Sequence, residues 1–254
     1  MALIKTPEEI IALAAGGKIL AHILNAVAGA VKPGVSTLEL DKIARAEMKK
    51  AGVGPAFEGY QMAGQGPKYP AVLCSSIDHE VVHGIPHSAR ILEEGQIIGL
   101  DLGIIYKELY TDAALTVPVG KISPENETLL QVTREALEAG IAQVKPGNRI
   151  GDVAHAIQTT AKEGGFAVIR DLIGHGVGHA LHEKPDVPNY GRPGTLEELK
   201  SGMVIAIEPM FTRGDWRIKF LNDGWTVVTA DGSPAAHFEH TVAVTSDGHK
   251  VLTK

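Results

Sequence analysis

One unit of sequence occurs twice in this chain and limits the folds that it can adopt. The tetrapeptide Val-Lys-Pro-Gly stands at residues 31–34 and again at 144–147, 113 residues later. Each copy follows one run of helical periodicity and precedes another, and Pro-Gly is common punctuation between helices. The match is short, but the flanking helix-turn-helix pattern repeats with it. We therefore expect one domain over residues 1–254 with an internal duplication, its halves covering roughly 10–120 and 121–250.

Capping signals mark the helices. Thr6-Pro7-Glu8-Glu9 combines a hydroxyl cap, a proline at the first helical position and a glutamate that can reach back to the cap. Ser36 and Glu39 repeat the hydroxyl and glutamate pair. The predicted helices run from these caps to about residues 30 and 50, and in the second half over about 127–143 and 150–163.

Apolar runs follow each pair of helices. They cover residues 71–74, 80–83, 96–105 and 113–117 in the first half, and 203–208, 225–229 and 238–244 in the second. We expect 96–105 to form a hairpin with 113–117, and 225–229 to form one with 238–244 around Asp231-Gly232-Ser233. Each half then contributes helices and an antiparallel sheet, which predicts an α+β fold with the sheets meeting in the centre.

Composition narrows the class of protein. With 44% hydrophobic and 21% charged residues the chain is an ordinary globular protein, and a net charge of -6 argues against nucleic acid or a membrane surface as its main partner. Its single cysteine, Cys74, excludes an internal disulfide and a cysteine-rich zinc site. The N-terminus turns acidic at Glu8 before any apolar run long enough for a signal peptide or a membrane span, so we expect a cytoplasmic protein.

Histidine and glycine are concentrated in residues 174–183, Gly-His-Gly-Val-Gly-His-Ala-Leu-His-Glu. Glycine disfavours a helix, because it costs about 1 kcal/mol there relative to alanine. We expect these glycines to let the backbone approach whatever His175, His179 and His182 hold. Imidazole is the commonest transition-metal ligand, so a metal is the first hypothesis and structural histidines are the alternative.

Four carboxylates interrupt the apolar segments. Asp101 and Asp112 flank a turn predicted at Tyr106-Lys107, which would place them directly opposite each other on one face of a hairpin. Two like charges so close need a cation or a shared proton. Glu208 and Glu239 repeat the anomaly in the second half. Any one of the four could be a solvated strand end, but as a set they favour a metal centre.

A second metal-binding motif matches in sequence but not in its expected secondary structure. Residues 79–83, His-Glu-Val-Val-His, match the H-E-x-x-H motif of zinc metalloproteases, which requires both histidines on one face of a helix. Two β-branched valines followed by Gly84-Ile85-Pro86 predict a strand and a turn instead. We therefore expect no zinc site of that class.

The motifs together resemble one known family, the type I methionine aminopeptidases of the pita-bread fold, over essentially the whole chain. The resemblance is carried by Val82-His83-Gly84-Ile85-Pro86, Asp101 with Asp112 eleven positions later, Gly174-His175-Gly176-Val177-Gly178, Leu181-His182-Glu183-Lys184-Pro185, Ile207-Glu208-Pro209-Met210 and Glu239-His240-Thr241. It implies two pseudo-symmetric halves with antiparallel sheets in the centre and helices outside.

The resemblance also implies a site and an activity. The ligands of two divalent metal ions would be Asp101, Asp112, His175, Glu208 and Glu239. A metal-bridging water or hydroxide would attack the first peptide bond of a nascent polypeptide and release its N-terminal methionine. Glu208 would carry the proton, His182 would stabilise the developing oxyanion, and His83 would contact the scissile amide or its leaving nitrogen.

The substrate side chain needs an apolar pocket. The family lines that pocket where this chain has Tyr69, Cys74, Leu181 and Trp225, and ordinary core packing is the alternative for these residues. His179, Leu181 and the run Asp78-His79-Glu80 depart from the family's usual residues, which bears on pocket shape and on any accessory monovalent-ion site.

The ligand set is rich in oxygen and suits cobalt, manganese or iron at least as well as zinc. A monomer that acts on nascent chains at the ribosome is the expectation from the family.

Prolidases and proline-specific aminopeptidases carry the same ligands but usually an additional N-terminal domain, for which the residues before the first repeat leave no room. Type II methionine aminopeptidases would carry a large insertion between His182 and Glu208. A non-catalytic binding relative would typically have lost ligands.

Overall fold

The structure is a computed structural model and describes residues 4–61 and 66–254. Its helices are α1 (Pro7–Gly29), α2 (Thr37–Ala51), α3 (Pro124–Ala142) and α4 (Ile150–Gly164). The first two begin as predicted. The hydroxyls of Thr6 and Ser36 accept hydrogen bonds from the backbone N–H groups of Glu9 and Glu39, and those carboxylates accept from the N–H groups of the caps.

Helix α3 begins before its predicted start near residue 127. Ser123 is its cap and accepts a hydrogen bond from the N–H of Asn126, and Pro124 occupies the first turn. This is the same hydroxyl and proline signal that opens α1, so the earlier start could have been read from the sequence.

Nine strands form one central sheet. They are β1 (Gly54–Pro55), β2 (Leu73–Ile77), β4 (Ile97–Tyr106), β5 (Leu109–Pro118), β7 (Gly174–Gly176), β8 (Glu183–Val187), β9 (Val204–Ile207), β14 (Glu239–Val244) and β15 (His249–Val251). The order is β1-β4-β5-β14-β9-β7-β8, with β2 on β4 and β15 on β14. Two three-stranded sheets flank it: β13 (Ala235–His237), β10 (Met210–Thr212) and β6 (Ala167–Val168); and β11 (Ile218–Phe220), β12 (Val227–Thr229) and β3 (Glu80–Val82).

Strand β14 joins the two halves of the chain. It pairs with β5 of the first half, where Glu239 lies opposite Ala114, and with β9 of the second half, where His240 lies opposite Ile207. The strands of the two halves therefore form one continuous sheet, and the ends of β5, β9 and β14 come together near the middle of that sheet.

The register predicted for the first hairpin is wrong by two residues. The turn lies at Lys107 and Glu108, whose φ angles of 50° and 64° are left-handed, so Asp101 lies opposite Ala114 and Asp112 lies opposite Gly103. Neither residue is the glycine or asparagine that such a turn favours, which is why the sequence did not place it. An even shift keeps a side chain on the same face, so the two aspartates still share one face of the sheet.

The second predicted hairpin does not form. β12 pairs with β11 and β3, and β14 pairs with β5, β9 and β15. The residues between them, around Asp231-Gly232-Ser233, lead instead into β13, which pairs with β10. The 225–229 segment thus contributes β12 to the small flanking sheet with β11 and β3.

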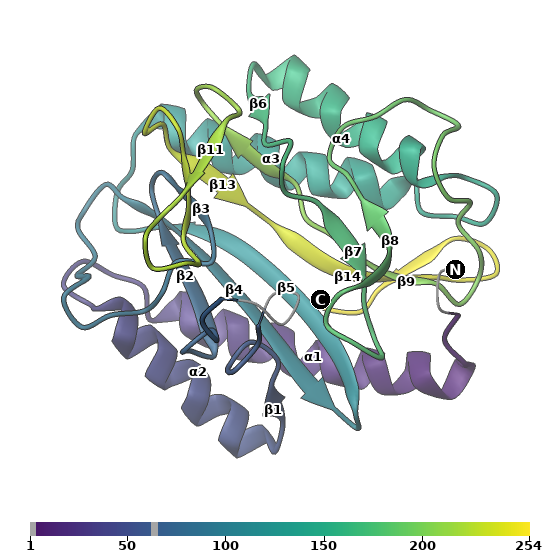
Figure 1. Ribbon diagram of the computed structural model, residues 1–254, viewed down its shortest axis with the longest axis horizontal. Helices are drawn as coiled ribbons and strands as arrows, with labels where there is room; N and C mark the ends of the chain where they lie inside the picture. Colours follow the sequence, from purple (N-terminus) through teal and green to yellow (C-terminus); the bar gives the residue numbers. More distant parts are fainter. Residues whose placement is uncertain (1–3, 62–65) are drawn as a thin grey trace.

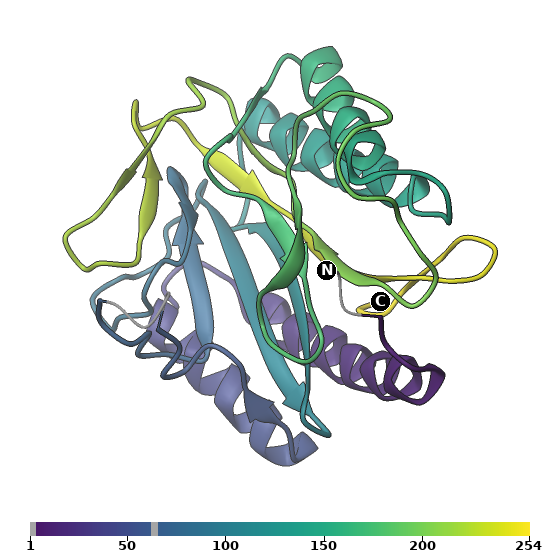
Figure 2. The ribbon, with the colours of Figure 1, turned by 45° about the vertical axis from the view of Figure 1, so that its right-hand side comes forward.

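Helices cover the outer faces of both halves. Helices α1 and α2 lie below β4 and β5 in Figure 1, and α3 and α4 lie above β9 and β14; Figure 2 shows the same arrangement after a 45° turn. Each half has its own core: one joins residues such as Leu20, Leu40 and Leu100, and the other joins residues such as Leu129, Ile157 and Val242. The predicted α+β class with outer helices is confirmed.

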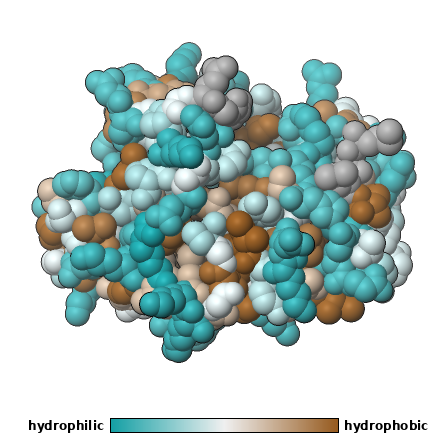
Figure 3. Space-filling view, turned by 60° about the horizontal axis from the view of Figure 1, so that its bottom comes forward, coloured by the Kyte–Doolittle hydropathy of each residue, from teal (hydrophilic) through white to brown (hydrophobic). Residues whose placement is uncertain are grey.

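Helix α1 corrects one expectation. It is long and apolar enough to cross a membrane by length and composition, contrary to the expectation that no such run exists near the N-terminus. Its residues Leu13, Leu20, Ile23, Leu24 and Val27 are buried, as in the core helix of a globular protein. The space-filling view that brings the lower side of Figure 1 forward shows mostly hydrophilic side chains with scattered hydrophobic patches (Figure 3).

Candidate metal centre and active site

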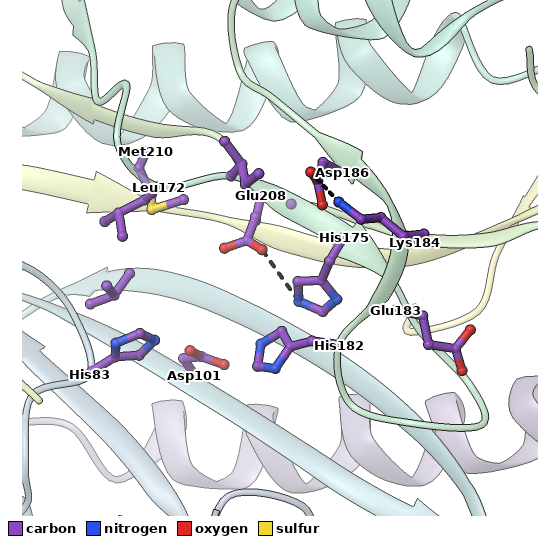
Figure 4. Close-up of a pocket in the computed structure, with 13 residues that line it drawn as sticks. His83, Asp101, Leu172, His175, His182, Glu183, Lys184, Asp186, Glu208 and Met210 are labelled. Atoms are coloured by element: carbon purple, nitrogen blue, oxygen red, sulfur yellow. Dashed lines mark hydrogen bonds and ion pairs between the residues drawn. The ribbon is translucent and has the colours of Figure 1, made fainter. Parts of the chain in front are cut away.

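All but one of the site residues expected from the sequence line one cavity of about 340 Å³; the exception is His179. Those that line it are Asp101, Asp112, His175, Glu208 and Glu239, with His83, His182, Tyr69, Cys74, Leu181 and Trp225. Phe57 and Tyr60 complete the lining and were not foreseen. An adjoining pocket of about 420 Å³ shares His83, Asp101, His175, His182 and Glu208 and adds Val82, Leu172 and Met210. Figure 4 shows the shared residues His83, Asp101, His175, His182 and Glu208 around a common space.

The ligand candidates come from strands of both halves. Asp101 lies on β4 and Asp112 on β5, while His175 lies on β7, Glu208 directly follows β9, and Glu239 begins β14. Because β5, β14, β9 and β7 are successive neighbours in the sheet, residues far apart in sequence reach one cavity.

The glycines around His175 serve the sheet rather than a ligand. A Cβ at Gly174 would lie 2.4 Å from the Ala206 carbonyl oxygen, and one at Gly176 would lie 2.3 Å from the Lys184 carbonyl oxygen. The backbone of β7 therefore approaches β9 and β8 too closely for any side chain. The interpretation that these glycines give room to the bound group is wrong, although His175 itself faces the cavity.

Donor atoms converge at the distances that a metal needs. Ligand atoms of Asp112, His175 and Glu239 all lie within 4.8 Å of one another. His175 Nε2 lies 3.5 Å from Glu208 Oε1, the pair joined by a dashed line in Figure 4. His175 Nδ1 donates to the Gly176 carbonyl oxygen at 2.9 Å, which leaves the Nε2 lone pair free for a cation.

Orphaned buried atoms indicate that a cation fits here. Among the residues that the structure describes, Asp101 Oδ1 and Glu239 Oε1 are buried without a hydrogen-bond partner. A buried polar atom without a partner costs free energy, and a buried charge costs more. Four carboxylates and an imidazole would satisfy two divalent ions in both charge and donor type.

Burial shifts the pKa values of the cluster. It raises the pKa of Asp112 to about 7 and that of Glu208 to about 8, and it raises those of Asp101 and Glu239 well above their usual range, with the neighbouring carboxylates adding to most of these shifts. Burial lowers the pKa of His175 to about 3, so its imidazole is neutral and able to bind a metal.

Between about pH 6.5 and 8, the metal-free protein should lose stability as the pH rises. Folded Asp112 and Glu208 hold protons up to pKa values of about 7 and 8, whereas unfolded carboxyls release them near pH 4. These bound protons stabilise the folded protein at low pH, and that stability is lost as the pH rises through the pKa values of the folded state. The buried histidines act in the opposite direction, but only below their unfolded pKa of about 6.5.

Thermal unfolding of chelator-treated protein across this pH range measures the effect. Added divalent metal should weaken the trend, since the cation replaces the protons. A metal-free melting temperature that rises with pH over the range would contradict the expectation.

An apolar subsite adjoins the carboxylates. Tyr69 and Trp225 pack edge to face with ring centroids 5.2 Å apart, and Cys74 and Leu181 belong to the same buried cluster. The Tyr69 hydroxyl donates to the Gly84 carbonyl oxygen at 3.0 Å, and Trp225 Nε1 donates to the Pro67 carbonyl oxygen at 3.1 Å. Both polar ends are thus satisfied, which leaves apolar ring surface for the cavity.

One nitrogen of the His182 ring has a hydrogen-bond partner. The Tyr60 hydroxyl lies 2.7 Å from His182 Nδ1, and burial raises the pKa of Tyr60, so the phenol is protonated and able to donate to that nitrogen. Burial also lowers the pKa of His182 to about 4, and in the tautomer that accepts from Tyr60 the neutral ring carries its proton on Nε2, where it can donate within the cavity. Sequence reasoning missed Tyr60, because nothing in its local pattern indicates a contact 122 residues away.

The loop that carries Leu181 and His182 is attached to the N-terminal segment. Lys5 Nζ pairs with Glu183 Oε2 at 2.5 Å in a buried ion pair, and His179 Nε2 lies 2.7 Å from Glu9 Oε1. Residue 178 must be glycine, because its φ is +140° and a Cβ there would lie 2.3 Å from Lys5 Cε. His179, one of the noted departures, therefore contacts α1 rather than the cavity.

Replacing Lys5 by methionine should lower the free energy of unfolding by about 3–5 kcal/mol, because Glu183 would remain buried without its partner. Urea denaturation measures the loss. The matched control is Lys184→Met, whose pair with Asp186 is 64% and 54% exposed and should matter by less than about 1 kcal/mol. Equal losses in the two variants would contradict the argument.

The H-E-x-x-H motif lies on a strand and a turn, as expected. Glu80 to Val82 form β3, and Glu80 pairs with Arg90 rather than facing the cavity. Only His83 of the motif lines the cavity, with a left-handed φ of 60°.

Comparisons with known proteins agree with this geometry. The pattern of metallopeptidase family M24 matches residues 12–246. Methionine aminopeptidase 1 of Bacillus subtilis is 44% identical over 254 residues and covers 100% of both chains. Methionine aminopeptidase 1 of Mycobacterium tuberculosis is 45% identical over 98% of this chain and 94% of its own.

Solved structures agree as well. The methionine aminopeptidase of Thermotoga maritima superposes with a TM-score of 0.96 at 47% identity, over 100% of both chains. The prolidase of Pyrococcus furiosus superposes with a TM-score of 0.77 at 25% identity, over 100% of this chain but 66% of its own. These neighbours confirm the pita-bread fold. Because the family pattern spans most of the chain and relatives match it from end to end, this chain belongs to metallopeptidase family M24.

Proposed function

We propose that this chain is a metal-dependent methionine aminopeptidase that removes the N-terminal methionine from nascent polypeptides. The observation that carries the proposal is the junction of four carboxylates and His175 with apolar side chains in one cavity of about 340 Å³. The cluster suits a dinuclear metal centre, and the adjoining cavity suits one unbranched apolar side chain. The full-length relatives that carry the name methionine aminopeptidase support the same activity.

Five residues would hold two divalent ions, of cobalt, manganese, iron or zinc. They are Asp101, Asp112, His175, Glu208 and Glu239, which all line the cavity. When bound, such ions lower the pKa of a water molecule and so supply a nucleophile near neutral pH.

The chain's own residues would then position the substrate and move protons. Glu208 would hold, at a carboxylate oxygen, the proton that passes to the leaving amine. His182 would donate its Nε2 proton to the carbonyl oxygen as negative charge develops there. His83, which faces Trp225 edge on at a centroid distance of 6.0 Å, would contact the scissile amide or its leaving nitrogen.

The methionine side chain would lie among Tyr69, Cys74, Leu181 and Trp225. Sulfur packs favourably against aromatic rings at about 5 Å, and the Tyr69 and Trp225 rings border the cavity. Tyr60 and Phe57 would close its outer side, since both line the same space.

We place the whole activity in one catalytic domain over residues 1–254 with its two pseudo-symmetric halves. We further propose that the protein is a cytoplasmic monomer that meets its substrate at the ribosome. Neither nucleic acid nor a membrane is required by any residue of the site.

The experiment is hydrolysis of Met-Gly-Met-Met by metal-stripped protein, with and without added cobalt or manganese, beside an Xaa-Pro dipeptide. Metal-dependent release of one methionine, with the proline substrate untouched, is the expected result. Cleavage of the proline substrate alone would assign a prolidase activity. Cleavage of neither substrate, with metal bound, would indicate a binding protein.

A further inference from the structure

A histidine that the five-ligand set leaves out faces the same carboxylates. His237, the last residue of β13, is 3% exposed, and its Nε2 is buried without a hydrogen-bond partner among residues 4–61 and 66–254. It ends β13, and only Phe238 separates it from Glu239, the first residue of β14.

The distances from His237 fit shared coordination better than hydrogen bonding. Its Nε2 lies 3.5 Å from Glu208 Oε2 and 4.0 Å from Glu239 Oε2. An N–H···O hydrogen bond is about 2.7–3.2 Å long. Two ligands that each lie about 2.0–2.2 Å from one tetrahedral metal are on the order of 3.4 Å apart. The first distance matches that separation, as does the 3.5 Å between His175 Nε2 and Glu208 Oε1.

Glu208 therefore stands between two imidazoles. One oxygen is directed at His175, as Figure 4 shows, and the other is directed at His237. Two groups of converging ligand atoms result, Asp112 with His175 and Glu239, and Glu208 with His237 and Glu239. Each contains one imidazole, and Glu239 belongs to both, as a bridging ligand would.

The backbone of His237 is held in place from the opposite half of the chain. Its N–H donates to Thr116 Oγ1 at 2.9 Å, and the Thr116 hydroxyl donates to the His237 carbonyl oxygen at 2.8 Å. On the other side, His237 lies opposite Met210 in the pairing of β13 with β10. These contacts hold the backbone of His237 in place without any hydrogen bond by the ring.

We infer that His237 Nε2 is a sixth ligand of the metal centre and completes a set with Glu208 and Glu239. The inference rests on the proposed metallopeptidase function. His237 would give this group of ligand atoms an imidazole of its own, which favours zinc, cobalt or iron over magnesium or calcium at that position.

The test compares wild-type protein with His237→Gln, which keeps a polar side chain and the backbone contacts to Thr116. Metal-free protein is titrated with zinc by calorimetry, and X-ray absorption of the zinc-loaded protein counts imidazoles. We expect wild type to bind two zinc ions with two imidazoles per chain. In the variant, the weaker site should lose about tenfold or more in affinity, and the count should fall to one.

The control is His240→Gln, three residues along, whose Nδ1 pairs with Thr253 Oγ1 at 2.9 Å and which should leave the titration and the count unchanged. An unchanged imidazole count in His237→Gln would overturn the inference, whether or not the affinity falls, because a residue that only orients Glu208 adds no nitrogen to the metal. Failure of wild type to bind zinc, cobalt or manganese would instead overturn the proposed function.

Discussion

Replacing Glu239 by glutamine should lower kcat/KM at least about 10³-fold, since a metal's electrostatic contribution is worth several kcal/mol and each 1.4 kcal/mol is about tenfold in rate. Glu239 is 2% exposed, begins the strand that joins both halves, and belongs to both groups of converging ligand atoms. Glutamine keeps the shape but loses the charge and one acceptor oxygen. Steady-state hydrolysis of Met-Gly-Met-Met, with metal content measured in the same samples, gives the result.

The matched control is Asp41→Asn. Asp41 is also 2% exposed, but it accepts hydrogen bonds from the N–H groups of Val72 and Leu73 and pairs with Arg45, outside the cavity. Its loss should reduce stability and leave the metal content of the folded protein intact. Normal turnover in Glu239→Gln, or equal loss of metal in both variants, would contradict the role given to Glu239.

Local signals predicted much of this fold because they act within a few residues. The capping pairs at Thr6 and Ser36 fixed two helix starts, and the apolar runs located β4, β5, β9 and β14 with small errors at their ends. Turn chemistry was less informative, because Lys107 and Glu108 adopt left-handed angles without glycine. The register of that hairpin is set by the packing of the strands rather than by its turn.

Strand partners in the second half could not be predicted for a related reason. The 225–229 and 238–244 runs are close in sequence, which favours a hairpin, but each has a better partner farther away. β12 pairs with β3, and β14 pairs with β5, so both strands join the second half of the chain to the first. Such pairings depend on the whole fold.

The residues of the candidate site also divide into those that local sequence reveals and those that depend on distant partners. Carboxylates within apolar strands are anomalous by themselves, so Asp101, Asp112, Glu208 and Glu239 could be singled out from sequence. Tyr60 and Lys5 act through partners 122 and 178 residues away, and no local pattern reveals them. His237 is the exception, because it stands only two residues before Glu239, and that short spacing could have indicated it.

Replacing His182 by alanine should lower kcat about 10²–10³-fold, the usual effect of removing one donor to a developing oxyanion. The metal content should stay unchanged, because His182 belongs to neither group of converging ligand atoms. KM should change little, since the hydrogen bond strengthens as the carbonyl becomes tetrahedral. Steady-state kinetics with parallel metal analysis separates the two quantities.

Tyr60→Phe tests whether the hydrogen bond to His182 contributes to the role of that imidazole. It keeps the imidazole and most of the ring contact but removes the O–H that donates to Nδ1, so the proton of His182 is free to occupy either nitrogen. Its kcat should fall by less than that of His182→Ala, and the double variant should be no slower than His182→Ala alone, because the phenol acts only through the imidazole. If the fall in kcat of the double variant equals the product of the two single falls, Tyr60 acts on the substrate independently of His182. If His182→Ala protein contains no metal, the imidazole binds the metal centre and does not act on the carbonyl oxygen.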